Sequence, residues 1–342
     1  MSLSGLLPLL GQTEQFSGLI NSLKSPRGQA AAIATDPATE ATIATLWREI
    51  DAPVFVLTPN PDSARKLHDR LFTWLGDSAP IFHFAESEDI PFERYVPDLG
   101  ASHQRIRTLA ALRGEIKNAR QPLVISSVSA ASQATLERAA FDGSTHSLSV
   151  RDRINLDKQI KTWLAMGYSH EPTVEVPGTM SRRGGILDIF PVSREFPIRI
   201  ELFDDEIESI RSFNPATQRS SRKIRNITIP PARETLPLLA DQDRVQEILG
   251  KMDLLGTSEE AQRRIPSELG QALAGETVDE ISFYAGFFNF GNIFDYLPTE
   301  SLLVQLRPGA IEEASHSQDR RMVQLREVKE KRGEVPVGFA QP

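Results

Sequence analysis

The first part of the chain alternates between short apolar runs and amphipathic segments with helical spacing. Apolar runs predict four strands, at Ala30–Ala34, Val54–Thr58, Ile81–Phe84 and Leu123–Ser127. Helical spacing predicts helices between them, at Thr39–Ile50, Ser63–Leu75 and Ser102–Leu112. Regular strand–helix alternation is typical of a parallel sheet with helices on its faces. We therefore expect an α/β domain over residues 1–143.

The pattern changes near Ser144, where the strand–helix alternation stops. A short helix at Leu156–Leu164, closed by Gly167, precedes a sheet that we expect to begin at Thr173–Val176 and to end near Ile229. This predicts a small α+β domain over residues 144–230, bounded by Pro230 and Pro231.

Residues 231–342 are predicted to be mainly helical. Their predicted elements are helices at Asp241–Leu254, at Glu259–Ala274 with an interruption near Pro266, and at Gly309–Arg332, besides a short strand at Leu302–Gln305.

The middle domain contains a strand with two different faces. Ile198, Ile200 and Leu202 alternate with Arg199, Glu201 and Phe203, so the first set forms a buried face and the second a polar face. Exposed arginine and phenylalanine are typical anchors of protein interfaces. Alternatively, Phe203 packs under a loop while Arg199 pairs with Asp204 or Glu201.

The face of Arg183 is ambiguous. Its number differs from those of the apolar Leu187 and Ile189, later in the same run, by an even count, so simple alternation would place it on their buried face. A bulge at Gly184-Gly185 could move it to the polar face.

Charge and composition narrow the classes of function. The net charge is −8, which does not favour a dedicated nucleic-acid binder. Residues 182–233 nevertheless hold ten Lys/Arg against seven Asp/Glu, a local surplus that fits an acidic partner or a soluble edge strand equally well. The absence of cysteine, signal peptide and long apolar run fits a cytoplasmic protein without a membrane contact.

A nucleotide-binding protein of this kind would carry its phosphate loop after the first strand. The segment from Thr35 to Thr42 matches G-x-x-x-x-G-K-[ST] only at Thr42, since Thr35, Glu40 and Ala41 replace the two glycines and the lysine. Glu40 would place negative charge beside the phosphates. The prediction is a nucleotide site that has lost its function and a chain without a cofactor.

Other candidate sites have structural alternatives. Four carboxylates and Tyr95 between Glu86 and Pro97 could form a metal or catalytic site, but a loop is favoured. Five aromatic residues between Phe283 and Phe290 could stack bases, but the lack of nearby Lys or Arg favours a buried cluster that joins the third segment to the first domain. Six scattered histidines have no metal-ligand spacing.

The stretch from Arg183 to Ser220 resembles the second domain of bacterial transcription-repair coupling factors, and more loosely that of the excision-repair protein UvrB. It contains Arg-Gly-Gly-Ile-Leu-Asp-Ile-Phe-Pro, followed by Ile-Arg-Ile-Glu-Leu-Phe-Asp-Asp-Glu-Ile-Glu-Ser-Ile. The resemblance implies a domain that binds UvrA through Arg183, Arg199 and Phe203. Truncating Arg199 or Phe203 is then expected to weaken docking and leave the core intact.

The resemblance also implies an architecture: a degenerate RecA-like domain, completed by the C-terminal segment, around the inserted second domain. The family's polymerase-binding domain and translocase motor, expected intramolecular partners, are absent from these residues, so we expect an N-terminal fragment that is not itself an enzyme and does not contact DNA alone. Two alternatives are a UvrB-type ATP-dependent helicase-like repair protein and an intramolecular clamp that keeps the motor inactive.

Overall fold

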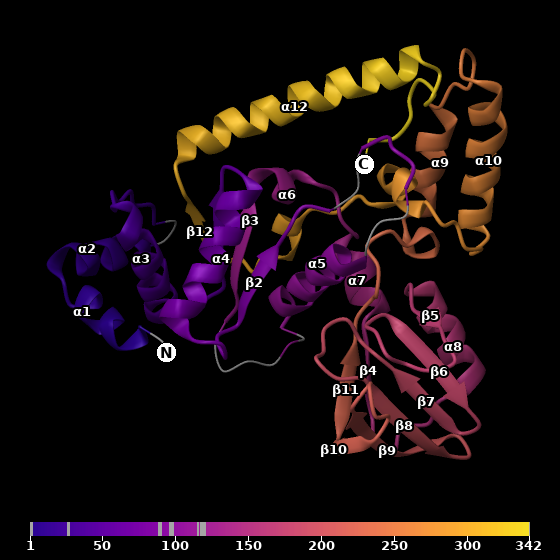
Figure 1. The fold of residues 1–342 in the computed structure, drawn as a ribbon, viewed down its shortest axis with the longest axis horizontal. Coiled ribbons are helices and arrows are strands. Elements are labelled where there is room, and N and C mark those ends of the chain that lie inside the picture. Colours follow the sequence, from indigo (N-terminus) through magenta and orange to yellow (C-terminus); the bar gives the residue numbers. More distant parts are fainter. Residues whose placement is uncertain are drawn as a thin grey trace. The chain divides into compact units, whose positions relative to one another are not determined.

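A computed structural model describes residues 3–25, 28–87, 91–95, 99–114, 116 and 121–341. The chain divides into two compact units, each built from separate stretches of sequence. The first unit comprises Met1–Glu86, Ala111–Ala131 and Leu297–His316, and the second comprises Ser87–Ala110, Ser132–Tyr296 and Ser317–Pro342. Figure 1 labels most of the helices and strands of both units.

The first unit contains a parallel four-stranded sheet in the order β12-β1-β3-β2. Its strands are β1 (Val54–Thr58), β2 (Ile81–Phe84), β3 (Leu123–Ser127) and β12 (Leu302–Gln305). All four strands have the predicted bounds. β12 pairs with β1 in the register Val54–Leu302, so a C-terminal segment completes the sheet of the N-terminal domain. The predicted α/β class is confirmed.

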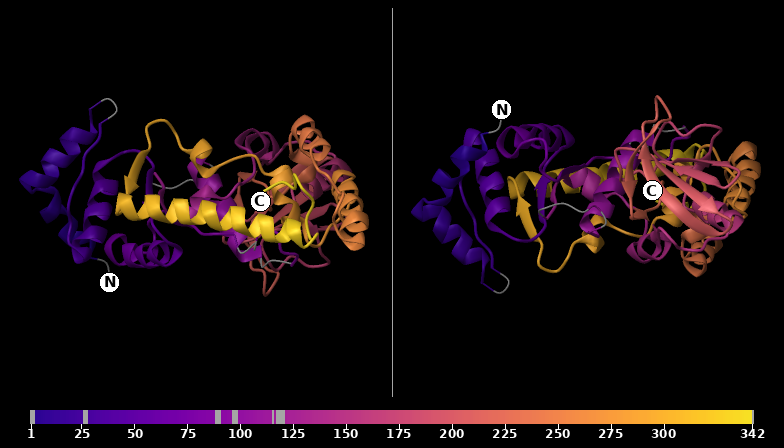
Figure 2. Two further views of the ribbon diagram at one scale, coloured as in Figure 1. Left: turned by 90° about the horizontal axis from the view of Figure 1, so that it is seen from above. Right: turned by 90° about the horizontal axis from the view of Figure 1, so that it is seen from below.

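Helices cover this sheet because they carry apolar faces. The helices that begin the chain are η1 (Ser4–Leu6), α1 (Leu7–Gly11), α2 (Glu14–Leu23), α3 (Asp36–Glu49) and α4 (Pro61–Leu75). Leu67 and Leu71 of α4 pack with Val54 and Val56 of β1 in one buried cluster. Figure 2 shows α1 to α3 as a group of indigo helices beside the sheet.

The strand predicted at Ala30–Ala34 is wrong. These residues form no helix or strand, and Ile33 is fully exposed. The run offers only alanine and one isoleucine for burial, so a fifth strand would bury little apolar surface. The helix predicted to follow it is confirmed as α3, but it does not follow a strand.

The second unit contains a six-stranded sheet in the order β10-β9-β8-β7-β6-β5. Its strands are β5 (Ser169–His170), β6 (Thr179–Arg183), β7 (Ile186–Ile189), β8 (Ile198–Phe203), β9 (Glu206–Phe213) and β10 (Ser220–Ile224). All neighbouring pairs are antiparallel except β5 with β6. A separate ribbon joins β4 (His146–Ser149) to β11 (Asn226–Ile229), which ends at the predicted Ile229.

The strand predicted at Thr173–Val176 is wrong, because that segment is irregular and the sheet begins at Ser169. Val174 is nevertheless fully buried, in a small cluster with Phe190 and Phe213. The segment thus packs through Val174 against Phe190 and Phe213 without forming a strand.

The remaining helices are α5 (Leu99–Leu112), α6 (Val128–Ser132), α7 (Arg138–Ser144), α8 (Leu156–Ala165), η2 (Pro237–Leu239), α9 (Gln242–Gly250), α10 (Glu259–Leu273), η3 (Ile281–Tyr284), α11 (Ala285–Phe288), η4 (Ile293–Tyr296) and α12 (Pro308–Lys331). They include five that the sequence predicts, α5, α8, α9, α10 and α12, and six that it does not predict. The predicted interruption of the helix near Pro266 is wrong, since α10 continues through that residue. Among the described residues, no helix combines the length and apolarity that crossing a membrane requires.

Four of the five aromatic residues between Phe283 and Phe290 are buried, as predicted, and Phe290 is half-buried. Phe283, Tyr284, Phe287 and Phe288 form one cluster with Phe92 from the preceding part of the chain. A base-stacking platform needs exposed rings, so the stacking alternative is excluded for these four side chains.

Candidate functional site

One face of the six-stranded sheet carries a transverse row of polar residues. The register aligns Ser181 of β6, Asp188 of β7, Arg199 of β8 and Arg211 of β9. Directly opposed residues on neighbouring strands point to the same face. The other face carries Met180, Leu187, Ile189, Ile198, Ile200 and Ile210, all buried. The alternation predicted for β8 is therefore present in the sheet, although Leu202, which was expected on the buried face, is only half-buried.

Arg199 is held by the carboxylate of Asp188, directly opposite on the neighbouring strand β7. Its Nε and Nη2 donate to Oδ1 and Oδ2 of Asp188, each at 2.8 Å, in a bidentate pair. Asp188 is 1% exposed, and the Arg199 side chain is 17% exposed. Hydrogen bonding to Asp188 raises the pKa of the Arg199 guanidinium above its ordinary value. The partner is neither of the carboxylates that the sequence suggested.

Two further contacts fix the Arg199 head group. Its guanidinium carbon lies 4.7 Å from the centre of the buried Phe213 ring, and Nη1 donates to the carbonyl oxygen of Gln218 at 3.3 Å. Arg199 is thus oriented by the protein, and it also neutralises a buried charge.

Arg183 lies on the same polar face. It pairs with Ile186 across a two-residue turn of Gly184 and Gly185, in which Gly184 has a φ of 61°. Residues 183 and 186 are paired across the turn and therefore point to one face, although alternation along the sequence would place residues three apart on opposite faces. The two glycines form the turn itself, so the bulge suggested from the sequence is not needed. Arg183 Nη2 donates to Asp188 Oδ2 at 3.2 Å, and 54% of its side chain is exposed.

Phe203 ends β8 beside this turn and is 78% exposed. Leu202 donates its backbone N–H to the carbonyl oxygen of Gly185 at 2.9 Å, which fixes the end of β8 against the β6–β7 turn. We call the exposed surface formed by Arg183, Phe203 and the Gly184-Gly185 turn the docking corner. The alternative in which Phe203 packs under a loop is excluded by its exposure.

Sequence reasoning missed Asp188, the residue that connects Arg183 with Arg199. It also missed the neighbouring pair of Arg211 Nη2 with Glu201 Oε2, at 3.6 Å. A signal for Asp188 was present, because a lone carboxylate between Leu187 and Ile189 must face the polar side of the strand.

The residues of the degenerate phosphate loop lie in the first turns of α3. Glu40 is buried and accepts from Arg70 Nη1 at 2.9 Å. Thr42 Oγ1 donates to the carbonyl oxygen of Ala38 at 2.8 Å, and Ala41 packs against the core of the first unit. Thr35 caps the helix through its backbone, without a side-chain hydrogen bond. Each of these residues has an ordinary role in a helix.

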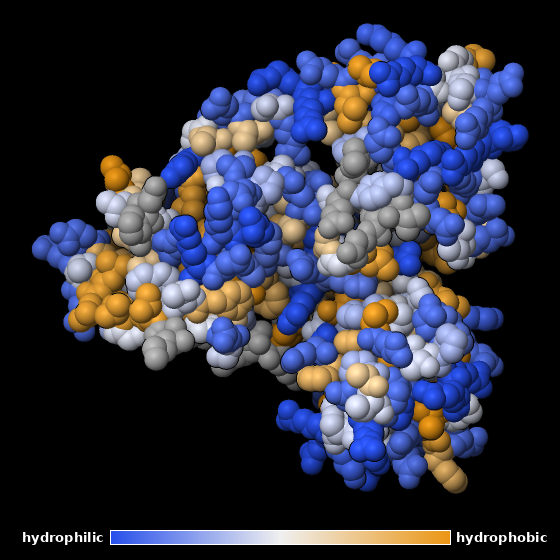
Figure 3. Space-filling model, viewed as in Figure 1, coloured by the Kyte–Doolittle hydropathy of each residue, from blue (hydrophilic) through white to orange (hydrophobic). Residues whose placement is uncertain are grey.

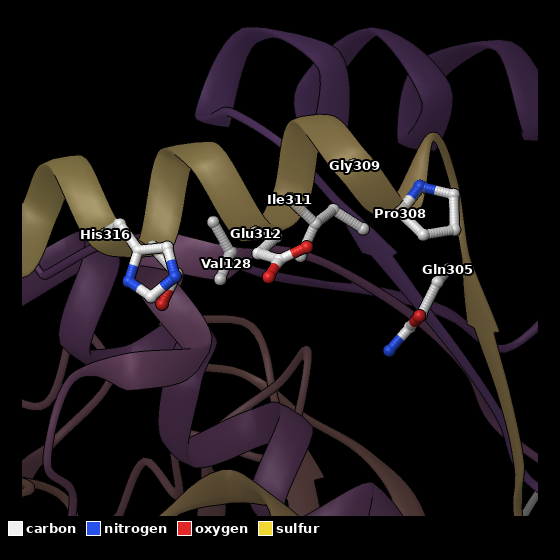
Figure 4. A pocket seen from close by; sticks show the side chains of 8 residues that line it. Val128, Gln305, Pro308, Gly309, Ile311, Glu312 and His316 are labelled. Atoms are coloured by element: carbon white, nitrogen blue, oxygen red, sulfur yellow. The ribbon is translucent and has the colours of Figure 1, made fainter.

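A groove lies at the carboxyl edge of the parallel sheet, where α/β proteins commonly bind ligands. Figure 4 shows Gln305 at the end of β12, Val128 after β3, and Glu312 and His316 on α12 around it. Its described lining residues include neither Lys nor Arg, nor any residue of the segment Thr35–Thr42.

The described carboxylates of the segment between Glu86 and Pro97 each contact a different part of the chain. Glu86 accepts a hydrogen bond from Ser129, and Glu93 accepts from Lys329 Nζ at 2.7 Å. Glu88 and Asp89 lie outside the described residues. Among the residues that the structure describes, no group of three or more His, Asp or Glu side chains could hold a metal ion.

Comparison with known proteins connects this sheet with a family. Residues 147–234 match the family model described as the UvrB interaction domain. The resemblance is confirmed. The matched residues include the whole polar face, from Ser181 to Arg211, and the docking corner.

Similarity to curated proteins extends beyond the UvrB interaction domain. The chain is 28% identical over 304 residues to the transcription-repair-coupling factor of Bacillus subtilis, which covers 86% of this chain and 25% of that protein. It is 31% identical over 207 residues to the factor of Myxococcus xanthus, covering 59% of this chain and 17% of that protein. It is 26% identical over 307 residues to the UvrABC system protein B of Fervidobacterium nodosum, covering 84% of this chain and 46% of that protein. The chain therefore spans a quarter or less of the two coupling factors and less than half of this relative of the B type.

Proposed function

We propose that this chain is a non-catalytic adaptor that docks UvrA in nucleotide excision repair coupled to transcription. The names of its relatives, transcription-repair-coupling factor and UvrABC system protein B, support a role in DNA repair. The observation that carries the finer proposal is the docking corner, in which an exposed phenylalanine on β8 and an exposed arginine on β6 lie near the same β6–β7 turn, within the residues that match the UvrB interaction domain.

The chemistry of the docking corner suits a protein partner. A phenylalanine in water has a large apolar area to bury, and the adjacent guanidinium supplies directed donors for a carboxylate or carbonyl of the partner. The Leu202–Gly185 hydrogen bond joins the end of β8 to the β6–β7 turn, and the Arg183–Asp188 contact orients the Arg183 side chain. Rigid anchors lose little conformational entropy on binding. Arg199 contributes as a second donor that is already oriented.

The proposed organisation has three parts, a degenerate RecA-like domain at residues 1–143, the UvrA-binding domain at 144–230, and a segment at 231–342 that packs on the first. The matched range 147–234 and the pairing of β12 with β1 support it. In a full-length protein of the coupling-factor type, a polymerase-binding domain and a motor would be further partners.

The test is the affinity of purified UvrA for the 342-residue chain, by calorimetry, with Phe203→Ala as the first variant. We expect a loss of about 2 kcal/mol, roughly a thirtyfold weaker Kd, with an unchanged melting temperature. Phe196→Ala is the matched control, because Phe196 is also exposed but precedes β8 at its other end. Wild-type affinity of Phe203→Ala, or equal losses for the two variants, would show that UvrA binds elsewhere.

A further inference from the structure

The edge strand β10 of the six-stranded sheet carries a concentration of positive charge. β10 is the last strand of this sheet, and it pairs only with β9 among the described strands, so its other edge has no strand partner. The strand reads Ser-Ser-Arg-Lys-Ile, and its first four residues are exposed. Arg219 precedes it and Arg225 follows it, both exposed.

None of the cations on this edge is neutralised within the described part of the chain. Arg219, Arg222, Lys223 and Arg225 form no ion pair with the described carboxylates. Figure 3 shows hydrophilic residues gathered over the end of the sheet where β10 lies. In a protein with a net charge of −8, four adjacent cations without carboxylates are a local exception.

A fifth cation comes from a different segment. Arg194, in the connection between β7 and β8, also makes no ion pair with the described residues. Burial lowers the pKa of its guanidinium, and the nearby charge of Arg222 lowers it further. Two like charges close together destabilise the fold. Cations that served only to keep the edge strand soluble would not need to lie so close to one another.

We propose that β10, with Arg194, Arg219, Arg222, Lys223 and Arg225 around it, is a docking edge for an acidic, extended segment of another protein, which adds to the sheet as a further strand. This surface is distinct from the docking corner, and the inference does not depend on the binding of UvrA.

The backbone favours a strand over a nucleic acid as the occupant. An open edge presents N–H donors and C=O acceptors in alternation, and an incoming strand satisfies both kinds of group. A phosphate backbone offers only acceptors, and the negative charge of the whole chain disfavours its approach. Alternate side chains of an added strand point to one face, so acidic residues at every second position could meet Arg222 or Lys223.

The same cations disfavour pairing of this edge with a second copy of itself. Two β10 strands side by side would bring four or more positive charges together, and the repulsion disfavours a second copy, whereas an acidic strand is attracted. The irregular register between Ser220 and Lys223 further limits pairing with unselected edges. Selectivity for acidic strands therefore follows from charge and not from apolar contact.

The experiment uses a fluorescent peptide of eight residues, alternating glutamate and threonine, titrated with the 342-residue chain and followed by anisotropy. We expect saturable binding with a Kd below about 1 mM that weakens as salt rises. The peptide with lysine in place of glutamate, and the peptide with proline in place of threonine, should not bind, because the first reverses the charge and the second removes backbone donors.

The double variant Arg222→Glu/Lys223→Glu should weaken binding of the glutamate peptide about tenfold or more. Lys158→Glu/Lys161→Glu is the matched control, since these exposed lysines of α8 give the same change in net charge elsewhere in the domain. It should bind like the wild type.

Four results would overturn the proposal. They are no saturable peptide binding, equal losses for the two double variants, binding of the proline peptide as tight as that of the threonine peptide, and tighter binding of an oligodeoxythymidine through Arg222 and Lys223. The last would identify the edge as a nucleic-acid surface.

Discussion

Asp188 is a buried carboxylate whose charge is balanced from two neighbouring strands. Arg199 supplies a bidentate pair from β8, and Arg183 a single, longer contact from β6. A carboxylate that is 1% exposed has lost nearly all contact with water, and its contacts with these two arginines offset the cost of burying it. Arg199 is therefore a structural residue of the polar face as well as a candidate binding residue.

We predict that Arg199→Ala destabilises the chain by about 2–4 kcal/mol, because it leaves the charge of Asp188 buried without its main partner. Arg183→Ala, which removes a half-exposed side chain, should change the free energy of unfolding by less than about 1 kcal/mol. Chemical denaturation of the two variants measures the difference. If Arg199→Ala unfolds like the wild type, Asp188 is not the charge that Arg199 balances.

A double substitution separates charge from packing. Asp188→Leu with Arg199→Met removes both charges and keeps similar volumes, so it should recover most of the stability lost in Arg199→Ala. The contact of Arg199 with buried Asp188 argues against the sequence-based expectation that truncating Arg199 leaves the core intact. A loss of UvrA binding in Arg199→Ala must be compared with the fraction of folded protein, whereas Phe203→Ala carries no such complication.

The sequence predicted the two faces of β8 but not the partners of their residues. Period-2 alternation is a local property, so Arg199 and Phe203 could be assigned to one face from their positions alone. The contact of Arg199 with Asp188 depends on the register between β7 and β8, which the alternation leaves open. The face of Arg183 depends on a two-residue turn, and counting along the sequence cannot distinguish that turn from a bulge.

At the scale of elements, α10 shows tertiary packing overriding local propensity. Pro266 lies in its interior, where proline removes a backbone hydrogen bond and crowds the preceding turn. The helix continues because Ala261 and Ile265 before it, and Leu269 and Ala272 after it, are all buried in one cluster. Apolar burial on both sides of Pro266 maintains a helix that the sequence alone predicted to be interrupted.

We predict that Pro266→Ala raises the free energy of unfolding by about 1–2 kcal/mol, since it restores the hydrogen bond and keeps the buried face unchanged. Gln262→Ala, one turn earlier on the exposed side, is the control and should change stability by less than about 0.5 kcal/mol. Urea denaturation measures both variants. A loss of stability in Pro266→Ala would mean that the proline fits a locally distorted helix better than alanine does.

The parallel strands were predictable because each is a compact apolar run. β1, β2, β3 and β12 have the bounds that the sequence indicates, since every one of them is rich in β-branched or aromatic residues or leucine. Ala30–Ala34 has the same polarity but not the same side-chain volume, and it stays outside the sheet. Hydrophobic periodicity alone does not measure how much area a run can bury.

At the scale of the whole molecule, we predict that the chain neither binds nor hydrolyses ATP. Thr35, Glu40 and Ala41 replace the glycines and the lysine of a phosphate loop, and the carboxylate of Glu40 is paired with Arg70. Equilibrium titration with a fluorescent ATP analogue and Mg²⁺ tests this, and saturable binding in the micromolar range would contradict it. Glu40→Gly/Ala41→Lys should create no ATPase and should lower stability, because it breaks the ion pair and adds a glycine within α3.

The parallel pairing of β1 with β12 has a consequence for synthesis on the ribosome. β1, β2 and β3 leave the ribosome early, yet β12 follows only after about half of the chain has been translated beyond Ser127. At about 5–20 residues per second, the outer edge of β1 waits on the order of ten seconds or more for its partner. In this interval the strands of the six-stranded sheet, which are neighbours in sequence, can already pair. Until β12 arrives, the unpaired edge of β1 can pair with strands of other chains, so aggregation is favoured at this stage of synthesis.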